Sequence, residues 1–164
     1  MQVVKIGKVQ NSLRKALTGP NRIPKDKAVA QALTNVEEIR GALTQGIGEE
    51  ISKLHHLALR REEPVSDDTI EEGVALAGVL YNLAGAMGYH CLQAISASLS
   101  DLFVVMSDGG SRSNESILVH ARAAMLASPG MPPLSRETEQ ELLDKLKDVV
   151  SFAGSVPDRS GKAT

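Results

Sequence analysis

Residues 73–100 read GVALAGVLYNLAGAMGYHCLQAISASLS, a stretch that contains no Asp, Glu, Lys or Arg. Its apolar residues recur at spacings of three and four up to Met87 and again from Leu92, which is the periodicity of a helix that buries one face. Gly88 stands between the two runs, where a glycine lets the chain turn. The stretch therefore predicts an antiparallel pair of helices at the centre of the fold, over about 67–87 and from Gly88 to Asp108.

The same periodicity continues on the N-terminal side of this pair. One apolar stripe runs through residues 26–61 and predicts a long first helix. Gly46 and Gly48 in its middle each cost about 1 kcal/mol relative to Ala in a helix, so a kink or break is expected near them. Ser66, Asp67, Asp68 and Thr69 are start signals for the second helix, and Thr69 and Glu72 stand at capping-box spacing.

Two further helices are expected on the C-terminal side. Ser113 or Asn114 can cap a fourth helix that ends at 128–130, and Ser135 can cap a fifth that ends at Gly154. No segment shows sustained alternation of apolar and polar residues, which is the pattern of a half-buried strand. The sequence thus predicts an all-α fold, an up-and-down four-helix bundle with an additional helical segment and a basic N-terminal arm.

The chain of 164 residues is long enough for one core and too short for two comfortable domains. Residues 1–24 are expected to form the basic arm, 25–154 the helical bundle and 155–164 a flexible tail. The first 25 residues contain six Lys or Arg and no acid, which favours a solvated arm. The alternative for this arm is a short strand or packing on the bundle, through its apolar residues Val3, Val4, Ile6 and Val9.

Composition excludes several classes of function. A net charge of −2 and an aromatic content of 2% give no basis for binding nucleic acid. The single cysteine, Cys91, and the absence of zinc-type Cys/His spacing predict a reducing compartment, no metal and no cofactor. No apolar run follows the basic arm, so we expect a cytoplasmic protein. Polar residues such as Asn82 and Gln93 interrupt 73–100, and we expect no membrane span.

The histidines are the candidates for chemistry near neutral pH. His55 and His56 are adjacent and therefore point about 100° apart on a helix, with His56 on the solvated side near Lys53 and Arg60. His90 and Cys91 are neighbours at a turn with no third group to orient a base, so no nucleophilic site is expected there. His120 is expected to pack at the flank of the fourth helix.

A family resemblance is carried by residues 77–89, followed by Leu92, and by residues 117–126. These segments resemble the central hairpin and a late helix of histidine phosphotransfer domains, in which a helix carrying His-x-Leu-Lys-Gly runs into a small-residue turn. In one register Gly78 stands where that family has its phosphorylated histidine, and Tyr81 and Asn82 replace the Lys-Gly pair. In the other register Tyr81 takes the place of the histidine. Neither register supplies a histidine.

The charges around this hairpin also differ from what phosphoryl transfer needs. Cations near a phosphohistidine neutralise the phosphate oxygens. Between Arg61 and Arg112 the sequence has eight acids and no Lys or Arg. The resemblance therefore implies a bundle that has lost its acceptor, a non-catalytic module that docks a receiver domain or a kinase in bacterial two-component-type signalling. Its expected partner-binding residues are Gly78, Tyr81, Asn82 and Gly85.

Two alternatives stay open at the level of sequence. One is an active histidine phosphotransfer protein whose acceptor is displaced to His56, where Lys53 and Arg60 could flank the phosphate. The other is a structural helical protein that forms a homodimer, because an exposed part of the charge-free hairpin would bury itself against a second copy.

Overall fold

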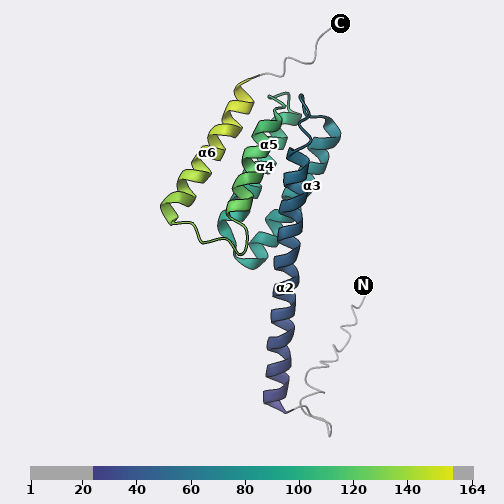
Figure 1. Ribbon diagram of the computed structural model, residues 1–164, viewed down its shortest axis with the longest axis vertical. Helices are drawn as coiled ribbons and strands as arrows, with labels where there is room; N and C mark the ends of the chain where they lie inside the picture. The colour runs from purple at the N-terminus through teal and green to yellow at the C-terminus, as the bar shows by residue number, and fades with distance from the viewer. Residues whose placement is uncertain (1–23, 157–164) are drawn as a thin grey trace, which may run out of the picture. The chain divides into compact units, whose positions relative to one another are not determined.

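The structure, a computed structural model, describes residues 24–156 (Figure 1). Five α-helices and no β-strand lie between these residues: α2 (Lys25–Ala58), α3 (Asp67–Met87), α4 (His90–Ser107), α5 (Asn114–Leu126) and α6 (Arg136–Ser155). The predicted all-α class and helix order are confirmed. The arm expected over 1–24 and the tail expected over 155–164 lie almost entirely outside the described residues. The chain divides into two compact units, 1–41 and 42–164, and α2 begins in the first and ends in the second.

The expected break in α2 is not found. The helix is continuous from Lys25 to Ala58 and passes through both Gly46 and Gly48. The next large residues, Ile47 and Ile51, are buried, so packing of this face offsets the low helix propensity of the glycines. Helix propensity alone therefore predicted the wrong local structure here.

Helix α3 starts at Asp67, among the expected start residues, but the expected capping box is not formed. Ser66 is the N-cap, and its hydroxyl accepts a hydrogen bond from the backbone N–H of Thr69. Glu62 supports this cap, because its carboxylate accepts hydrogen bonds from the hydroxyls of Ser66 and Thr69 at 3.0 and 2.8 Å. Thr69 is thus a residue of the first turn, and the pairing expected between Thr69 and Glu72 is wrong.

Helix α4 is central to the unit 42–164, since it contacts α3, α5 and α6. Its buried face and those of its neighbours form one apolar core, in which the largest side chain is Phe103. Gly88 joins α3 to α4 with a positive φ of 75°, which glycine adopts without strain. The hairpin expected from the charge-free stretch is therefore confirmed.

The loop between α2 and α3 is tied to the start of α5. The carboxylate of Glu63 accepts a hydrogen bond from the backbone N–H of Asn114 at 2.9 Å. The Asn114 amide donates to the carbonyl oxygen of Ala58 at 2.6 Å, and Arg112 forms an ion pair with Asp67 at 2.7 Å. Side chains and backbone groups more than 40 residues apart in sequence thus pair with one another at the helix ends, where the helix leaves backbone groups without an internal partner.

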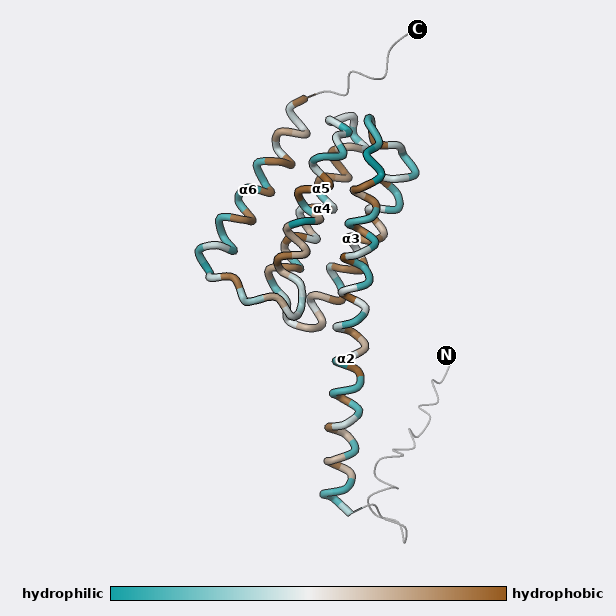
Figure 2. The backbone as a smooth tube through the Cα atoms, viewed as in Figure 1, coloured by the Kyte–Doolittle hydropathy of each residue, from teal (hydrophilic) through white to brown (hydrophobic). Residues whose placement is uncertain are grey.

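Figure 2 shows that α2 carries brown, apolar positions on both sides of its midpoint. In the unit 42–164 most apolar residues of α2 are buried, namely Ile47, Ile51, Leu54, Leu57 and Ala58. In the unit 1–41 the apolar residues of α2 are exposed, namely Val29, Leu33, Val36 and Ile39. The apolar periodicity of α2 is therefore continuous, although its residues are exposed in the unit 1–41 and mostly buried in the unit 42–164.

Candidate functional site

The four residues expected to bind a partner share one face of α3. Gly78, Tyr81, Asn82 and Gly85 stand at positions i, i+3, i+4 and i+7, which places them along one side of the helix. Tyr81 is 42% exposed and Asn82 is exposed. Val74, one turn before Gly78, is also exposed and extends this surface. We call the surface formed by these five residues the α3 face.

The two glycines of the α3 face differ in their surroundings. A Cβ atom added at Gly78 would meet no heavy atom within 4 Å, so the helix backbone is open there. A Cβ added at Gly85 would lie 2.6 Å from Nε2 of Gln93 in α4. Gly85 thus allows the Gln93 side chain to approach α3, whereas Gly78 leaves a gap in the α3 face.

His56, the alternative phosphate acceptor, is exposed on α2. The two cations expected to flank it are both engaged with acids. Lys53 binds Glu50 with an N–O distance of 2.6 Å, and Arg60 binds Glu72 with one of 2.8 Å. A phosphate on His56 would therefore compete with existing ion pairs for these cations.

His120 lies in the core, which corrects its expected place at a helix flank. Its side chain is fully buried, and it hydrogen bonds to Ser116 in α5 and to Ser98 in α4. Burial lowers its pKa, although the hydrogen bond to the Ser116 carbonyl acts in the opposite direction. The sequence held a signal for this burial, because His120 is in phase with Ile117 and Ala124 on the buried face of α5.

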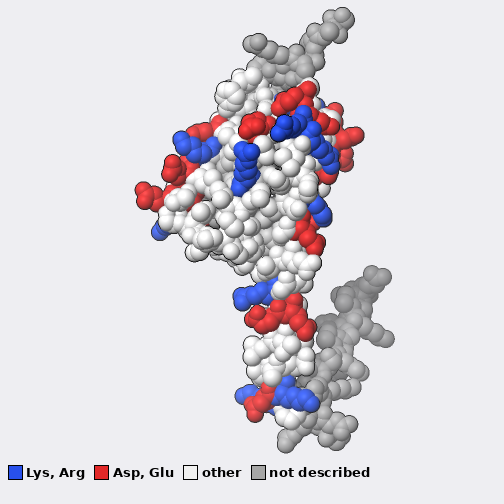
Figure 3. Space-filling view, viewed as in Figure 1, with Lys and Arg blue, Asp and Glu red and all other residues white. Residues whose placement is uncertain are grey.

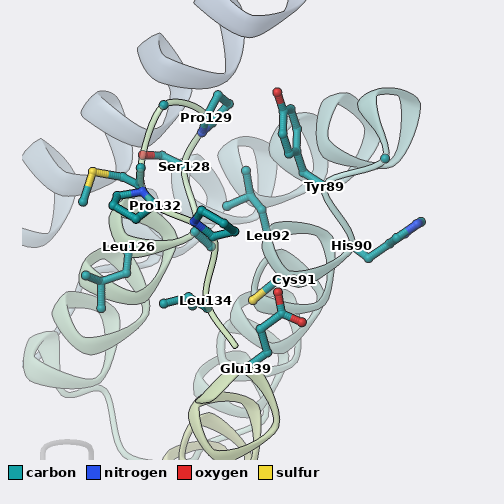
Figure 4. Close-up of a pocket in the computed structure, with 15 residues that line it drawn as sticks. Tyr89, His90, Cys91, Leu92, Leu126, Ser128, Pro129, Pro132, Leu134 and Glu139 are labelled. Carbon is teal, nitrogen blue, oxygen red and sulfur yellow. The ribbon is translucent and has the colours of Figure 1, made fainter. Parts of the chain in front are cut away.

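A cavity of about 310 Å³ lies at the start of α4, beneath the loop that joins α5 to α6 (Figure 4). Cys91 points into it, and Glu139 of α6 lies opposite. Burial raises the pKa of the Cys91 thiol, and the negative charge of Glu139 raises it further. Figure 4 shows the His90 ring pointing away from Cys91. The thiol therefore lacks both the low pKa and the adjacent base of a cysteine nucleophile.

A larger groove of about 660 Å³ lies between α2 and the end of α5. Residues of α2, including Gly48 and Ser52, form one wall, and the other wall combines Arg122 with the exposed apolar residues Met125, Leu126 and Met131. Residues 123–135 include no charged side chain, and Figure 3 shows an uncharged area over the α5–α6 connection. Sequence reasoning did not identify this groove, because its walls come from distant segments.

Within residues 24–156, no group of three or more His, Cys, Asp or Glu is placed to hold a metal ion. One helix among the same residues, α4, is long and apolar enough to cross a membrane by length and composition alone. Core helices of globular proteins share that composition, and α4 contacts three other helices.

Compared with known proteins, the chain matches no protein-family model, no curated protein and no solved structure.

Proposed function

We propose that this chain is a non-catalytic helical protein-binding module, which docks a receiver domain or a kinase of bacterial two-component-type signalling on its α3 face. The proposed architecture is an up-and-down four-helix bundle formed by residues 42–58 of α2 with α3, α4 and α5. Helix α6, which contacts α4 and α5, is the additional helix.

The observation that carries the proposal is an exposed helix face without charges. The cores of protein–protein interfaces are depleted in charged residues and enriched in Tyr, which often contributes a large share of the binding energy. Tyr81 provides such an anchor, Val74 adds apolar area, and the gap at Gly78 can receive a side chain of the partner. Asn82 supplies a hydrogen-bonding group beside them.

The non-catalytic part of the proposal rests on the groups that occupy the α3 face. Neither Gly78 nor Tyr81 can carry a phosphoryl group on an imidazole nitrogen, and no Lys or Arg lies between Arg61 and Arg112 to neutralise phosphate. The cations beside the alternative acceptor His56 are paired with acids. Docking without transfer is the function that these residues support.

Binding of the full chain to a broad panel of purified receiver domains and kinases tests this proposal, with affinity measured by calorimetry. We expect at least one binder, and Tyr81→Arg should weaken it tenfold or more, which corresponds to about 1.4 kcal/mol. Gly78→Arg should have a similar effect, because it fills the gap. The matched control is Ser151→Arg, which adds the same side chain at an exposed position of α6 and should leave the affinity unchanged.

Ser52→Arg separates the α3 face from the groove between α2 and α5. If this variant loses binding and Tyr81→Arg keeps it, the partner occupies the groove and the proposed face is wrong. A panel that gives no binder among receivers or kinases would contradict the proposed class of partner.

Radiolabel transfer from phosphorylated receivers tests the non-catalytic part directly. We expect no label on the wild-type chain. Label that appears on the wild type and disappears in His56→Ala would instead show the displaced phosphotransfer protein. Light scattering at high micromolar concentration tests the homodimer alternative, and we expect a monomer whose α3 face is free for another protein.

A further inference from the structure

The groove between α2 and the end of α5 can be followed from one end to the other. The start of α5 contacts the end of α2, because the Asn114 amide donates to the carbonyl oxygen of Ala58 at 2.6 Å. The end of α5 lies beside residues 44–55 of α2, where both helices line the groove. The two helices therefore run antiparallel, and the lining residues can be ordered along the length of the groove.

Arg122 and His55 line the end of the groove that lies towards Ala58. His55 is the lining residue of α2 closest in sequence to Ala58, and Arg122 is the lining residue of α5 closest to Asn114. Long side chains on a helix point back towards its N-terminus, which brings the Arg122 guanidinium further towards this end. Either tautomer of His55 can donate a hydrogen bond from its ring. This end therefore offers two donor side chains, one of them a permanent cation.

The opposite end of the groove is apolar. Its lining residues from the end of α5 and the following loop are exposed, namely Met125, Leu126 and Met131. Unbranched Met side chains adapt their shape to an apolar ligand. Thr44 and Gly48 of α2 line the same end, and a Cβ added at Gly48 would meet no heavy atom within 4 Å. This end therefore has room for an apolar chain.

The charge of the groove is complementary to an anion. No Asp or Glu is among the described residues that line it. Arg122 forms no ion pair with any other residue between 24 and 156. The acids of α2 nearest to Gly48 in sequence are Glu49, which accepts a hydrogen bond from Gln45, and Glu50, which binds Lys53. A guanidinium binds a carboxylate through two parallel hydrogen bonds, so Arg122 can bind a ligand of this class.

We propose that the groove binds a free fatty carboxylate of medium chain length, with its carboxylate at Arg122 and its chain along Met125 and Leu126. The volume of about 660 Å³ falls in the range of roughly 300–1,000 Å³ of small-molecule sites. Residues Thr44 to His55 span about 16 Å of α2, at about 1.5 Å per residue. An extended acyl chain advances about 1.3 Å per carbon, from C–C bonds of about 1.5 Å, so dodecanoate matches this length.

Calorimetry of the full chain with dodecanoate, below its micelle concentration, tests the proposal. We expect saturable binding. Arg122→Gln should weaken it at least tenfold, and Arg122→Lys, which keeps the charge, should weaken it less. The matched control is Arg136→Gln, at an exposed position of α6 outside the groove, which should leave the affinity within twofold of wild type. No binding to wild type at millimolar dodecanoate, or equal affinity of wild type and Arg122→Gln, would overturn the proposal.

The two ends of the ligand can be varied separately. Decanoate should bind roughly tenfold more weakly than dodecanoate, because each CH₂ group removed from water contributes about fourfold. Dodecyltrimethylammonium has the same chain with the opposite charge and should also bind at least tenfold more weakly. Equal affinity for both head groups would show apolar adsorption and refute the proposed contact with Arg122. Tyr81→Arg on the α3 face should leave the dodecanoate affinity within twofold of wild type, so failure of this proposal is distinguishable from failure of the proposed docking.

Two measurements locate the ligand in the groove. In NMR spectra of methyl-labelled methionines, dodecanoate should shift the signals of Met125 and Met131 and leave that of Met106, which is buried in the core. Gly48→Phe should fill the groove and abolish binding, whereas Gly41→Phe, on the same helix outside the groove, should not. Neither glycine has a heavy atom within 4 Å of an added Cβ. Binding without shifts of Met125 and Met131, or binding that survives Gly48→Phe, would place the ligand elsewhere and overturn the proposal.

Discussion

The Nε2 atom of His120 in α5 lies 3.0 Å from the hydroxyl oxygen of Ser98 in α4. Its Nδ1 atom lies 2.9 Å from the carbonyl oxygen of Ser116. A carbonyl only accepts, so Nδ1 carries the proton, and Nε2 of the neutral ring accepts the hydrogen bond from Ser98. The buried imidazole thus joins two helices of the core as a neutral group.

Stability is expected to depend on the protonation of His120. Burial lowers its pKa below the ordinary 6.5 in the folded state, so the unfolded chain takes up a proton first as the pH falls. The contribution of the neutral ring is fully present above pH 6.5 and is lost as the pH falls from there towards the folded-state pKa. This loss has a limiting slope of about 1.4 kcal/mol per pH unit.

Urea unfolding from pH 7.5 to pH 5 measures this dependence. The His120→Gln variant keeps an amide that can donate and accept, and it should show a flatter pH dependence than wild type. Equal slopes for wild type and His120→Gln would show that His120 does not titrate differently on folding.

Two glycines of α3 are expected to respond to Ala in opposite directions. At Gly73 an added Cβ meets the ring of Phe103, with Cε1 only 2.6 Å away. Gly73→Ala should therefore destabilise the fold by about 1–3 kcal/mol, as overpacking does. At Gly78 the space is open, and Gly78→Ala should stabilise it by about 0.5–1 kcal/mol through helix propensity. Thermal unfolding of the two variants measures both effects, and a shift of the same sign in both would contradict this account.

The N-cap serines of α3 and α5 are expected to differ in importance. Ser66 accepts a hydrogen bond from the Thr69 N–H, so Ser66→Ala should cost about 1 kcal/mol of unfolding free energy. Ser113 makes no side-chain cap, and Glu63 accepts from the N–H of Asn114 instead. Ser113→Ala should cost less than half as much, and Glu63→Ala about 1 kcal/mol or more. Chemical denaturation of the three variants compares these values.

Cys91 is expected to be a slow nucleophile. Burial and the charge of Glu139 both raise the pKa of its thiol, so little thiolate exists at neutral pH. The rate of iodoacetamide alkylation should rise with pH to a midpoint above that of a free cysteine. Glu139→Gln should lower this midpoint and Glu137→Gln, two residues away and on another side of α6, should not. A midpoint unchanged by Glu139→Gln would leave burial as the sole cause.

Most of the fold could be predicted because helix spans follow directly from apolar spacing. The stretch 73–100 gave both helices of the central hairpin with its turn at Gly88. Spacing does not say which part of a helical stripe is covered, so the exposure of Val29 and Leu33 could not be read in the same way. Caps such as Ser66 also depend on a loop residue, Glu62, that no local pattern identifies.

The candidate site, like the fold, could be predicted from the sequence only in part. Gly78, Tyr81, Asn82 and Gly85 lie on one face of α3 because they stand at positions i, i+3, i+4 and i+7, while their role in binding stays a prediction. The groove between α2 and α5 and the hydrogen bond between Ser98 and His120 arise from contacts between segments distant in the sequence. Such contacts depend on tertiary packing, which a single sequence does not encode as a local pattern.

The exposure of Tyr81 has an optical consequence. The chain contains two Tyr and no Trp, so its intrinsic fluorescence comes from Tyr81 on the α3 face and from Tyr89, which is partly buried beside the cavity at the start of α4. A soluble quencher should reach Tyr81 more easily than Tyr89. A bound partner that contains Trp would accept excitation energy from Tyr81 at close range, which allows docking to be followed in solution without any added label.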